Sequence, residues 1–448
     1  MTRRWFAGPA ALGLTMAVGL TACGGSGAST SGGGGGGAGA QKAVPSTTAA
    51  SDQSLTVWVM TGDYTPETVN AINAEFTKQT GAKVNVQIQT WDGITTKITT
   101  ALATSTPPDV LDLGNTQVAS FAATGGLADM TPYKQDMAQG QTWLKGLEEP
   151  ATVDGALYAI PGFAGARAVI YNKTMWAKAG VTSTPTTYDE LTKALDKVKA
   201  ANHAPDFSPL YLPGQYWYVG LQFVWDAGGE IATNSNGKWT SGMSTPQAQQ
   251  GLQNWKTFQN TYSTPASRTL NSDSPDQTQL FAAGKVGAIV DTNGTVATIL
   301  KNNPALKESD LGSFPFPGRS GKSQPVMLGG SVWGIAAKSQ HNNLALQWIK
   351  IATNPDLQKT WVFGHDHWVP NSNEATQAAA AKVPALQKGF FEAALNSKAT
   401  PANPNWAQIE GNKTINQLFS AVASGSKSPQ DAAREYDGTA DKVLNSSP

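Results

Sequence analysis

The sequence holds a single cysteine, few charged residues and no excess of charge of either sign. One cysteine excludes an internal disulfide, so the fold must be held together by its core. Lysine plus arginine and aspartate plus glutamate are equal at 32 each, and charged residues make up only 14% of the chain. No charge imbalance therefore indicates a nucleic acid or a strongly acidic partner.

The N-terminus also lacks an apolar run long enough to span a membrane. Arg3 and Arg4 precede an apolar segment, 6–20, of about 15 residues, whereas a spanning helix needs ~20. The run leads into Leu20-Thr21-Ala22-Cys23, which resembles a lipobox, the motif whose cysteine is lipidated after cleavage. Residues 1–22 are therefore predicted to be a lipoprotein signal peptide. This prediction places the protein outside the cytoplasm, anchored to the cell membrane through a lipid on Cys23.

Two questions about this leader stay open. The alternative to a lipoprotein is an ordinary cleaved signal peptide with a chance cysteine. Thr2-Arg3-Arg4-Trp5-Phe6 also resembles a twin-arginine export signal, so Sec and twin-arginine export both remain. Residues 23–52 contain glycine, serine, alanine and threonine with almost no charge, which predicts a flexible tether with a reach of about 30 Å.

After the tether, about 400 residues remain, which is enough for two domains. They begin with a buried-strand pattern, Leu55–Met60, followed by Thr65-Pro66, a threonine cap with proline in the first helical turn. Two further strands are predicted at Val84–Ile88 and Pro108–Leu113, with helices between them. Alternating strands and helices predict a parallel α/β sheet, in which ligands bind at the carboxyl ends of the strands.

The second half of the chain also mixes strands with helices. Strands are predicted at Ala166–Asn172, Val286–Asp291 and Gly329–Ala336, and a capping box at Thr187–Glu190 opens a helix. Helices are expected at 344–352, 356–362 and 407–423, with a last one capped at Ser428-Pro429. Fourteen tryptophans beside many neutral polar residues suit a site for an uncharged, hydroxyl-rich ligand.

This order of segments resembles the extracellular solute-binding proteins of family 1, the sugar-binding lipoproteins of ABC importers that include maltose-binding proteins. The segments Phe76–Val84 and Ala168–Lys173 are the most diagnostic. The other segments that carry the resemblance are Leu55–Tyr64, Pro108–Thr131, Gly155–Ala179, Phe281–Thr298, Gly329–Ser339 and Pro355–Thr360.

The resemblance implies a two-lobe α/β periplasmic-binding-protein-like fold of type II, with the ligand in a cleft between lobes joined by hinge strands. Crossings are expected near 160–170, 289–293 and 326–333. These bounds give lobe one as 53–161 plus 292–327, and lobe two as 162–291 plus 328–448. Closing of the lobes around the ligand would present one shape to the membrane permease, without catalysis and without a cofactor. We expect a monomer that binds a small-molecule carbohydrate and no nucleic acid.

The same resemblance places polar ligand contacts after the first and third strands. Asp63 and Tyr64 lie in the first of these loops, where the Asp63 carboxylate can accept from two neighbouring hydroxyls. The alternative role for Asp63 is to balance the charge of the following helix N-terminus. Asn115, Thr116 and Gln117 stand where the family places hydroxyl contacts, with simple turn chemistry as the alternative.

Aromatic stacking residues are expected from the second lobe. Tyr216 and Trp217, next to Tyr218, lie where the family presents a stacking ring, and at least one of the three is expected to be core. Asn293 follows the strand at the second expected crossing, where the family motif continues with a tryptophan that this chain replaces with Val296.

Other tryptophans are candidates to replace that missing ring. Trp333, Trp368 and Trp406 are the replacements, each with core or helix packing as its alternative. His365 and His367 have the spacing of a metal pair, but no third ligand cluster lies near in sequence, so no metal is expected.

Two other function classes remain open. A membrane-anchored glycoside hydrolase would need two carboxylates across the scissile bond, and no pair stands out among Asp63, Asp112, Asp226 and Asp291. A sugar-sensing protein that feeds a signalling receptor would have the same fold. The expected substrate is a neutral di- or oligosaccharide. The segment Leu113–Gln117 and the tether resemble actinobacterial importers of disaccharides, some of them amino-sugar disaccharides such as chitobiose, but the sequence does not choose the sugar or its linkage.

Overall fold

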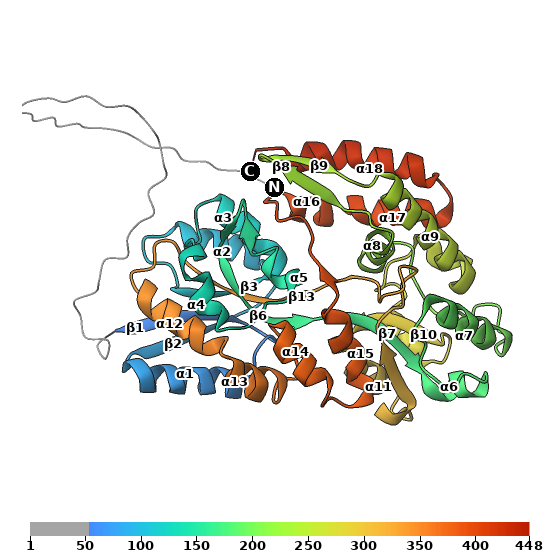
Figure 1. The fold of residues 1–448 in the computed structure, drawn as a ribbon, viewed down its shortest axis with the longest axis horizontal. Helices are drawn as coiled ribbons and strands as arrows, with labels where there is room; N and C mark the ends of the chain where they lie inside the picture. Colours follow the sequence, from blue (N-terminus) through green and yellow to red (C-terminus); the bar gives the residue numbers. More distant parts are fainter. Residues whose placement is uncertain (1–52, 448) are drawn as a thin grey trace, which may run out of the picture. The chain divides into compact units, whose positions relative to one another are not determined.

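The computed structural model describes residues 53–447, all within one compact unit of the chain, 45–448. The predicted signal peptide (1–22), the lipidated Cys23 and the tether to residue 52 lie outside the described residues. The described part contains two main sheets, each covered by helices (Figure 1). We call each sheet, with the helices packed on it, a lobe.

The first lobe is built on a six-stranded sheet with the order β14-β6-β13-β3-β1-β2. Its strands are β1 (Ser54–Met60), β2 (Lys83–Gln89), β3 (Val110–Gly114), β6 (Ala159–Gly165), β13 (Gly329–Ile335) and β14 (Val369–Pro370). β1 pairs in parallel with both β2 and β3, whereas β13 runs antiparallel to both β3 and β6. β1, β2, β3 and β6 therefore all end at the same edge of the sheet.

Helices pack on the first sheet, and the first of them begins where the local sequence predicts. Their bounds are α1 (Pro66–Thr80), α2 (Ile94–Ala103), α3 (Val118–Ala123), α4 (Lys134–Ala138), α5 (Lys145–Glu148), α12 (Asn342–Ala352) and α13 (Pro355–Leu357). The Thr65 side chain caps α1 by accepting from Thr68 N, and Pro66 occupies the first turn. Gly81 ends α1 at φ 77°, a left-handed conformation that glycine adopts without a Cβ clash. Phe76 of α1 is fully buried beneath the sheet.

The second lobe is built on a three-stranded antiparallel sheet with the order β10-β7-β11. The strands are β7 (Arg167–Asn172), β10 (Ala288–Thr292) and β11 (Leu311–Phe314). Its helices are α6 (Lys173–Lys178), α7 (Tyr188–Ala200), α8 (Trp217–Asp226), α9 (Pro246–Tyr262), α10 (Gln277–Ala282), α11 (Thr295–Asn302), α14 (Asn373–Ala380), α15 (Ala385–Ala394), α16 (Trp406–Gly411), α17 (Thr414–Ser424) and α18 (Pro429–Leu444). The capping box predicted at Thr187 and Glu190 is present at the start of α7.

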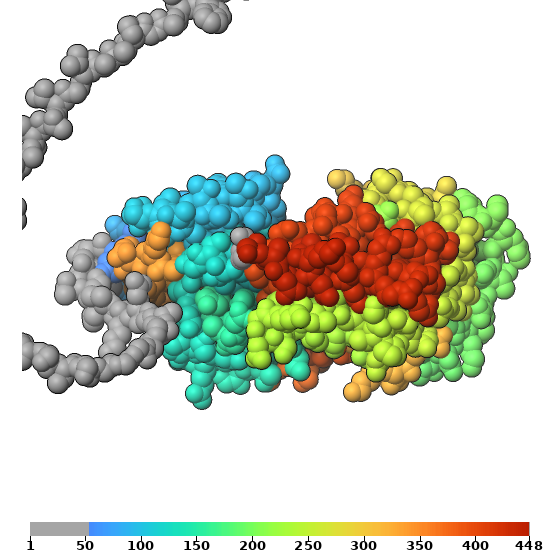
Figure 2. All heavy atoms as spheres, turned by 90° about the horizontal axis from the view of Figure 1, so that it is seen from above, coloured from blue at the N-terminus to red at the C-terminus, as the bar shows by residue number. Residues whose placement is uncertain are grey.

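Three short strand pairs complete the sheets. They are β4 (Thr152–Val153) with β5 (Ala156–Leu157), β8 (Ala232–Ser235) with β9 (Lys238–Ser241), and β12 (Val326–Met327) with β15 (Ser397–Lys398). Figure 2 shows the C-terminal helix α18, in red, lying along the yellow-green segment that carries β9 and α9. Asp437 and Asp441 of α18 fix this contact by accepting from the backbone N–H groups of Ser241, Met243 and Ser244.

Three hydrophobic cores hold the fold. One core lies within each lobe, around Trp333 in the first and Trp255 in the second. The third core gathers residues from the places where the chain passes between lobes, such as Ala164 and Ala166, with Phe390 of α15. Because this third core is shared by both lobes, packing there supports the connecting segments rather than either sheet alone.

The chain passes between the lobes at places that only partly match the expected ones. The first passage, at Ala166 between β6 and β7, lies inside the expected 160–170. The expected passage at 289–293 is absent, because β10 stays paired with β7 through Thr292 and α11 then packs against α10 of the second lobe. β11 pairs with the other side of β7, and the chain rejoins the first sheet at β13.

The lobe bounds given above are corrected accordingly. β11, within 292–327, belongs to the second sheet, whereas β13 and α12, within 328–448, belong to the first lobe. The chain returns to the second lobe after β14, where α14 and α15 pack into the third core. A strand followed by a turn and a helix has the same sequence pattern whether the chain passes to the other lobe or stays in its own. The sequence pattern alone therefore did not place the passages between the lobes.

Candidate ligand-binding site

Polar and aromatic side chains follow each of the first three strands at the edge where those strands end. Asp63 follows β1, Trp91 follows β2, and Gln117 follows β3. The chain leaves the same edge through β6 toward the second lobe. In open α/β sheets, ligands bind at the carboxyl ends of parallel strands. This edge is therefore the first half of the candidate site.

Asp63 lies over a buried second carboxyl group, Asp112 in β3. One Asp112 oxygen accepts from Met60 N at 3.0 Å and the other accepts from the Ser331 hydroxyl. Burial raises the pKa of Asp63 to about 7, although hydrogen bonds from Trp91 and Asp112 oppose this rise. Burial, and then the negative charge of Asp63, raise the pKa of Asp112 well above its usual range. The pair therefore holds a proton near neutral pH, which Asp112 donates to Asp63.

We expect Asp63 to make stability depend on pH. Its pKa rises from 3.8 to about 7 on folding, so the carboxyl is neutral in both states at low pH. Between about pH 4 and 7 the unfolded chain ionises first, and folding then opposes ionisation, so the contribution of Asp63 to stability falls with rising pH and levels off above 7. In urea unfolding followed by fluorescence, Asp63→Asn should gain on the order of 2 kcal/mol relative to wild type across this window. A constant difference between the two proteins from pH 4 to 8 would contradict the burial of Asp63.

An aromatic cluster forms the floor beneath Asp63. The ring of Tyr64 stacks on Trp333 at a centroid distance of 5.1 Å and contacts the edge of Phe163 at the same distance. Phe163 in turn stacks on Trp368 at 4.5 Å. Tyr64 and Trp333 are buried, with exposed fractions of 7% and 1%, so neither offers a free face to a ligand in this structure. In this structure both rings support the loop, and their contact with a ligand stays a prediction.

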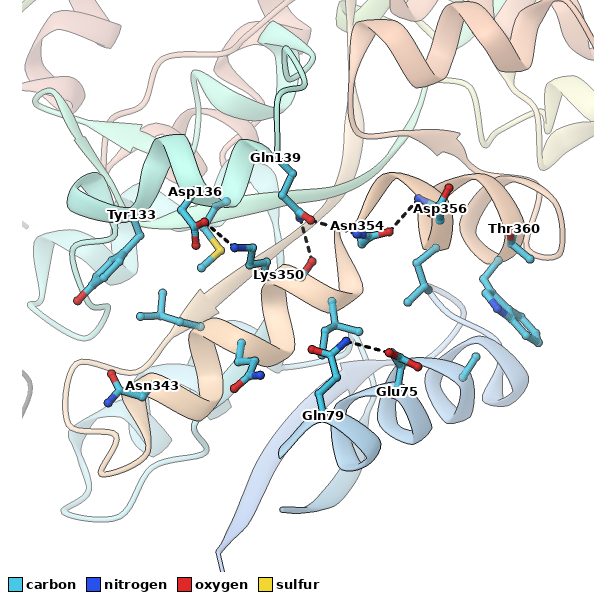
Figure 3. A pocket seen from close by; sticks show the side chains of 17 residues that line it. Glu75, Gln79, Tyr133, Asp136, Gln139, Asn343, Lys350, Asn354, Asp356 and Thr360 are labelled. Carbon is cyan, nitrogen blue, oxygen red and sulfur yellow. Dashed lines mark hydrogen bonds and ion pairs between the residues drawn. The ribbon is translucent and has the colours of Figure 1, made fainter. Parts of the chain in front are cut away.

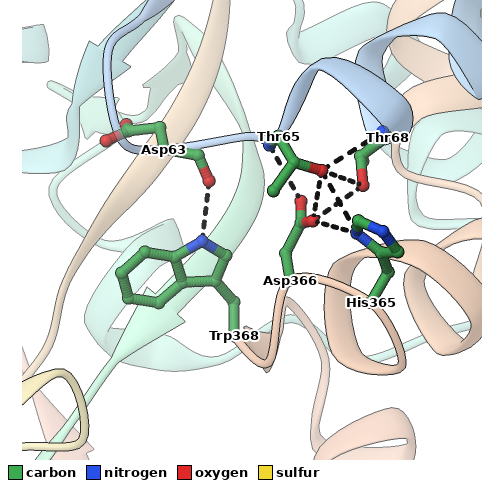
Figure 4. A network of polar contacts seen from close by, with 6 residues as sticks. All are labelled: Asp63, Thr65, Thr68, His365, Asp366 and Trp368. Carbon is green, nitrogen blue, oxygen red and sulfur yellow. Dashed lines mark hydrogen bonds and ion pairs between the residues drawn. The ribbon is translucent and has the colours of Figure 1, made fainter. Parts of the chain in front are cut away.

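A polar network holds the Asp63 loop from the other side (Figure 4). Trp368 Nε1 donates to the Asp63 carbonyl at 2.6 Å, so this half-buried tryptophan is fixed against the loop. Asp366 accepts from the hydroxyls of Thr65 and Thr68 at 2.7 and 2.9 Å, and His365 Nδ1 lies 2.9 Å from the same carboxylate. The network joins the start of α1 to the segment before β14 and so fixes where Asp63 points.

Of the three residues that follow β3, Asn115 is buried, whereas Thr116 and Gln117 are partly exposed. Asn115 donates to the carbonyls of Gly146 and Leu328 at 3.1 and 2.9 Å, which makes it a link within the fold. Its contact with a ligand hydroxyl stays a prediction. Thr116 and Gln117 are half-buried. Gln117 Nε2 donates to the Thr95 hydroxyl at 3.1 Å, and its carbonyl oxygen has no partner among the described residues.

Trp91 is a further candidate contact that was not predicted from the sequence. It lies just after β2 with 42% of its surface exposed, and its side chain hydrogen-bonds Asp63. A Cβ on Gly114 would come within 3.6 Å of its ring, so the indole also borders the end of β3. Its position two residues after a strand that ends at the same edge is the signal that could have identified it.

The second lobe carries the aromatic run predicted from the sequence. Tyr216 is buried, donates from its hydroxyl to the Val290 carbonyl at 3.0 Å, and burial raises its pKa to about 12. Trp217 is also buried and stacks on Tyr218 at 3.9 Å. Trp406 is fully buried, packs edge-on against Trp217 and donates to Glu410, so it belongs to the core. Of these rings, only Tyr218 lines a cavity without being buried.

A cavity of about 460 Å³ lies beside this run. Its lining comes from the end of β10, the start of β7, the start of α8, α10 and the loop before α10: Arg167, Tyr216, Tyr218, Ser272, Asp273, Asp276, Gln277, Thr278 and Asp291. Asn293, in the loop after β10, donates to the His367 carbonyl at 3.3 Å, next to Trp368. This contact links the second-lobe cavity region to the loop that supports Asp63.

A larger hollow, of about 890 Å³, lies elsewhere on the first lobe between α1, α4 and α12 (Figure 3). None of the predicted site residues lines it, and its one lysine, Lys350, pairs with Asp136. The larger hollow is therefore not the candidate site, because none of the predicted residues lies there.

Among residues 53–447, no group of three or more histidine, cysteine, aspartate or glutamate side chains could hold a metal ion. No helix in the same range is long and apolar enough to cross a membrane.

Comparisons with known proteins identify the family and the fold. The model of the family described as bacterial extracellular solute-binding protein matches residues 62–359. The chain is 36% identical over 438 residues to the diacetylchitobiose-binding protein DasA of Streptomyces coelicolor, with 97% of this chain and 98% of that protein covered.

Solved structures show the same fold. The sugar-binding protein MalE of Xanthomonas citri matches with a TM-score of 0.74 and 23% identity, covering 88% of this chain and 97% of that one. MalE of Listeria monocytogenes, solved with maltose, matches with a TM-score of 0.73 and 20% identity over the same shares. The fold is thus that of two-lobe proteins with a ligand cleft between lobes joined by hinge strands.

Proposed function

This chain belongs to the family of bacterial extracellular solute-binding proteins, and on that premise we propose that it captures a neutral sugar between its lobes and delivers it to the permease of an ABC importer. The family acts outside the cytoplasm, so the sugar is bound there. Binding favours the closed arrangement of the lobes because the sugar contacts both halves of the site only in that state. The permease then recognises the closed form.

The proposed substrate is an amino-sugar disaccharide of the diacetylchitobiose type. The observation that carries this choice is the 36% identity over nearly the whole chain to the Streptomyces coelicolor protein named for that sugar. The site chemistry supports it, because an exposed indole and uncharged or proton-sharing polar groups suit a neutral ligand with apolar C–H faces and hydroxyl edges.

We assign the contacts by position at the strand ends and by the exposure of the residue. In the first lobe, Trp91 provides a stacking surface, and the half-buried Asp63, Thr116 and Gln117 provide polar contacts. In the second lobe, the cavity beside Tyr218 receives the other end of the sugar. Tyr64, Trp333 and Trp368 support the Asp63 loop from below, and Asn293 links that support to the second lobe.

The N-terminal predictions complete the proposal. Lipidation of Cys23 after removal of residues 1–22 would anchor the protein to the outer face of the cell membrane, where its permease lies. Residues 24–52 would then act as a flexible tether. We propose that the protein acts as a monomer, as a single cleft needs no second copy.

A glycoside hydrolase is disfavoured by the carboxylates themselves. The two that interact in the site, Asp63 and Asp112, share hydrogen bonds, and Asp112 is 1% exposed with both oxygens engaged. A hydrolase needs two carboxyl groups on opposite sides of the scissile bond, at least about 5 Å apart. The relatives that we found are also binding proteins.

Calorimetric titration of the full chain with a sugar panel tests the proposal. We expect saturable one-to-one binding of diacetylchitobiose and weaker binding of cellobiose and maltose. No monosaccharide should be found in the calorimeter sample after the titration. Saturable binding of maltose alone would overturn the substrate, and cleavage of any sugar would overturn the binding role. A sugar sensor would bind in the same way, so uptake of radiolabelled diacetylchitobiose by cells that lack the protein separates the two. Undiminished uptake would favour sensing.

A further inference from the structure

The second-lobe cavity contains a cation without an ionic partner. Arg167, the first residue of β7, lines the cavity and donates from Nε to the Tyr216 hydroxyl at 3.2 Å. Within residues 53–447, no carboxylate lies within ion-pair distance of it, and neither of its terminal nitrogens has a hydrogen-bond partner. A guanidinium carries five N–H donors in a planar fork. Four of these donors are therefore available to a ligand.

An unpaired acceptor lines the same cavity. Gln277 of α10 is 2% exposed, and its Nε2 donates to Asp291 Oδ2 at 2.8 Å and to the Val290 carbonyl at 3.3 Å. Both of these neighbours are acceptors, so the amide nitrogen must face them. The carbonyl oxygen of Gln277 is left without a partner among the described residues. A buried carbonyl without a partner costs free energy that a ligand N–H can recover.

The Tyr218 ring is not available to stack on a sugar in this cavity. The Arg167 guanidinium lies 3.8 Å from the centre of the Tyr218 ring, and Trp217 stacks on that ring at 3.9 Å. At these distances the guanidinium and the indole must lie on opposite faces of the Tyr218 ring. Tyr218 therefore has no face free to stack on a sugar. Recognition in this half of the site therefore depends on polar groups.

The charges around the cavity also disfavour an anionic ligand. Three carboxylates, Asp273, Asp276 and Asp291, line it beside the single Arg167. Asp276 already accepts from Thr278 N and its hydroxyl, and Asp291 accepts from Thr292 N and Gln277. A uronic acid carboxylate would meet net negative charge here, whereas a neutral group would not.

We propose that Arg167 and Gln277 select sugars that carry an acetamido group, an inference that rests on the proposed function. The acetamido carbonyl accepts from the Arg167 fork, and the acetamido N–H donates to the unpaired oxygen of Gln277. A hydroxyl at the same sugar position offers one oxygen in place of the separate carbonyl and N–H of the acetamido group, so it does not reproduce this pair of contacts with the same spacing. The pair thus distinguishes diacetylchitobiose from cellobiose, which has the same linkage and hydroxyls in place of the acetamido groups.

The test compares the affinity of the full chain for two sugars that differ in the acetamido groups. Calorimetry on wild type and Arg167→Lys gives the affinity for diacetylchitobiose divided by that for cellobiose. Lysine keeps the charge but loses the planar fork. We expect the ratio to fall about 10-fold in Arg167→Lys, as one charged hydrogen bond is lost, with cellobiose affinity changed less than about 3-fold. Arg319→Lys is the matched control, because Arg319 also lies over a tyrosine ring, that of Tyr188 at 4.2 Å, and donates to its hydroxyl.

The outcomes are distinct. If wild type binds neither sugar, the proposed function fails and this inference fails with it. If wild type binds diacetylchitobiose but Arg167→Lys keeps the ratio, or lowers both affinities equally, the proposed function stands and the inference is overturned. Should Arg167→Lys not fold, the crystal structure of the wild-type complex decides. An acetamido oxygen within hydrogen-bond distance of Arg167 supports the inference, and one placed elsewhere overturns it.

Discussion

Trp91→Ala is expected to weaken sugar binding on the order of 10- to 100-fold, since loss of a stacking indole removes both contact area and ring-specific attraction. Trp91 is 42% exposed and sits where three strand ends meet, so its removal leaves no cavity in the core. The free energy of unfolding should therefore change by less than about 1 kcal/mol. Calorimetry for binding and urea unfolding for stability measure the two effects separately.

A matched control for Trp91→Ala exists on the same lobe. Tyr133 is 38% exposed and lines the separate hollow of Figure 3. Tyr133→Ala removes a similar exposed ring and should leave sugar affinity within about 2-fold of wild type. Trp91→Phe should recover part of the lost affinity, because a smaller ring still stacks. Equal losses in the two alanine variants would show that Trp91 does not contact the sugar.

Asp112→Ala is expected to lower the free energy of unfolding by about 2–4 kcal/mol. The carboxyl group is 1% exposed, and its removal leaves Met60 N and the Ser331 hydroxyl without their acceptors in the middle of the first sheet. Met60 is the last residue of β1 and precedes the loop that holds Asp63. Loss of its hydrogen bond should therefore lower the affinity for sugar as well. Urea unfolding followed by tryptophan emission measures the stability change.

Asp112→Asn is the informative companion to that variant. Because the pKa of Asp112 is raised well above its usual range, the group is neutral at pH 7, and an amide reproduces its shape and charge. Its oxygen accepts from Met60 N, and its nitrogen donates to Asp63 as the carboxylic acid does, although that nitrogen cannot accept from the Ser331 hydroxyl. We expect a loss of about 1 kcal/mol, smaller than that of Asp112→Ala. An asparagine as damaging as alanine would show that Asp112 is ionised in the folded protein.

Local signals in the sequence predicted the elements that position the site. Thr65-Pro66 begins α1 as expected, and the first three strands end within about two residues of their predicted ends. These signals are local, because a cap or a glycine acts through its own backbone. Even here one helix differed. The helix predicted at 407–423 is interrupted at Lys413, whose φ of 61° separates α16 from α17.

The side-chain roles were harder to predict, because they depend on packing between distant segments. Asn115 has the composition of a ligand contact, but Leu328, far along the chain, takes its amide hydrogen. Trp333 and Trp406 were predicted as stacking residues, and both are closed in by partners such as Tyr64 and Trp217. Trp91 carries no motif of its own. Only the parallel pairing of β1 and β2 brings it beside Asp63.

The measurement that tests the central claim most directly is small-angle X-ray scattering of the protein titrated with diacetylchitobiose. The account predicts that the radius of gyration falls as the lobes close, saturates at the same concentration as the calorimetric isotherm, and recovers when the intact sugar is removed. A radius that stays constant while the sugar saturates the protein would contradict capture by lobe closure.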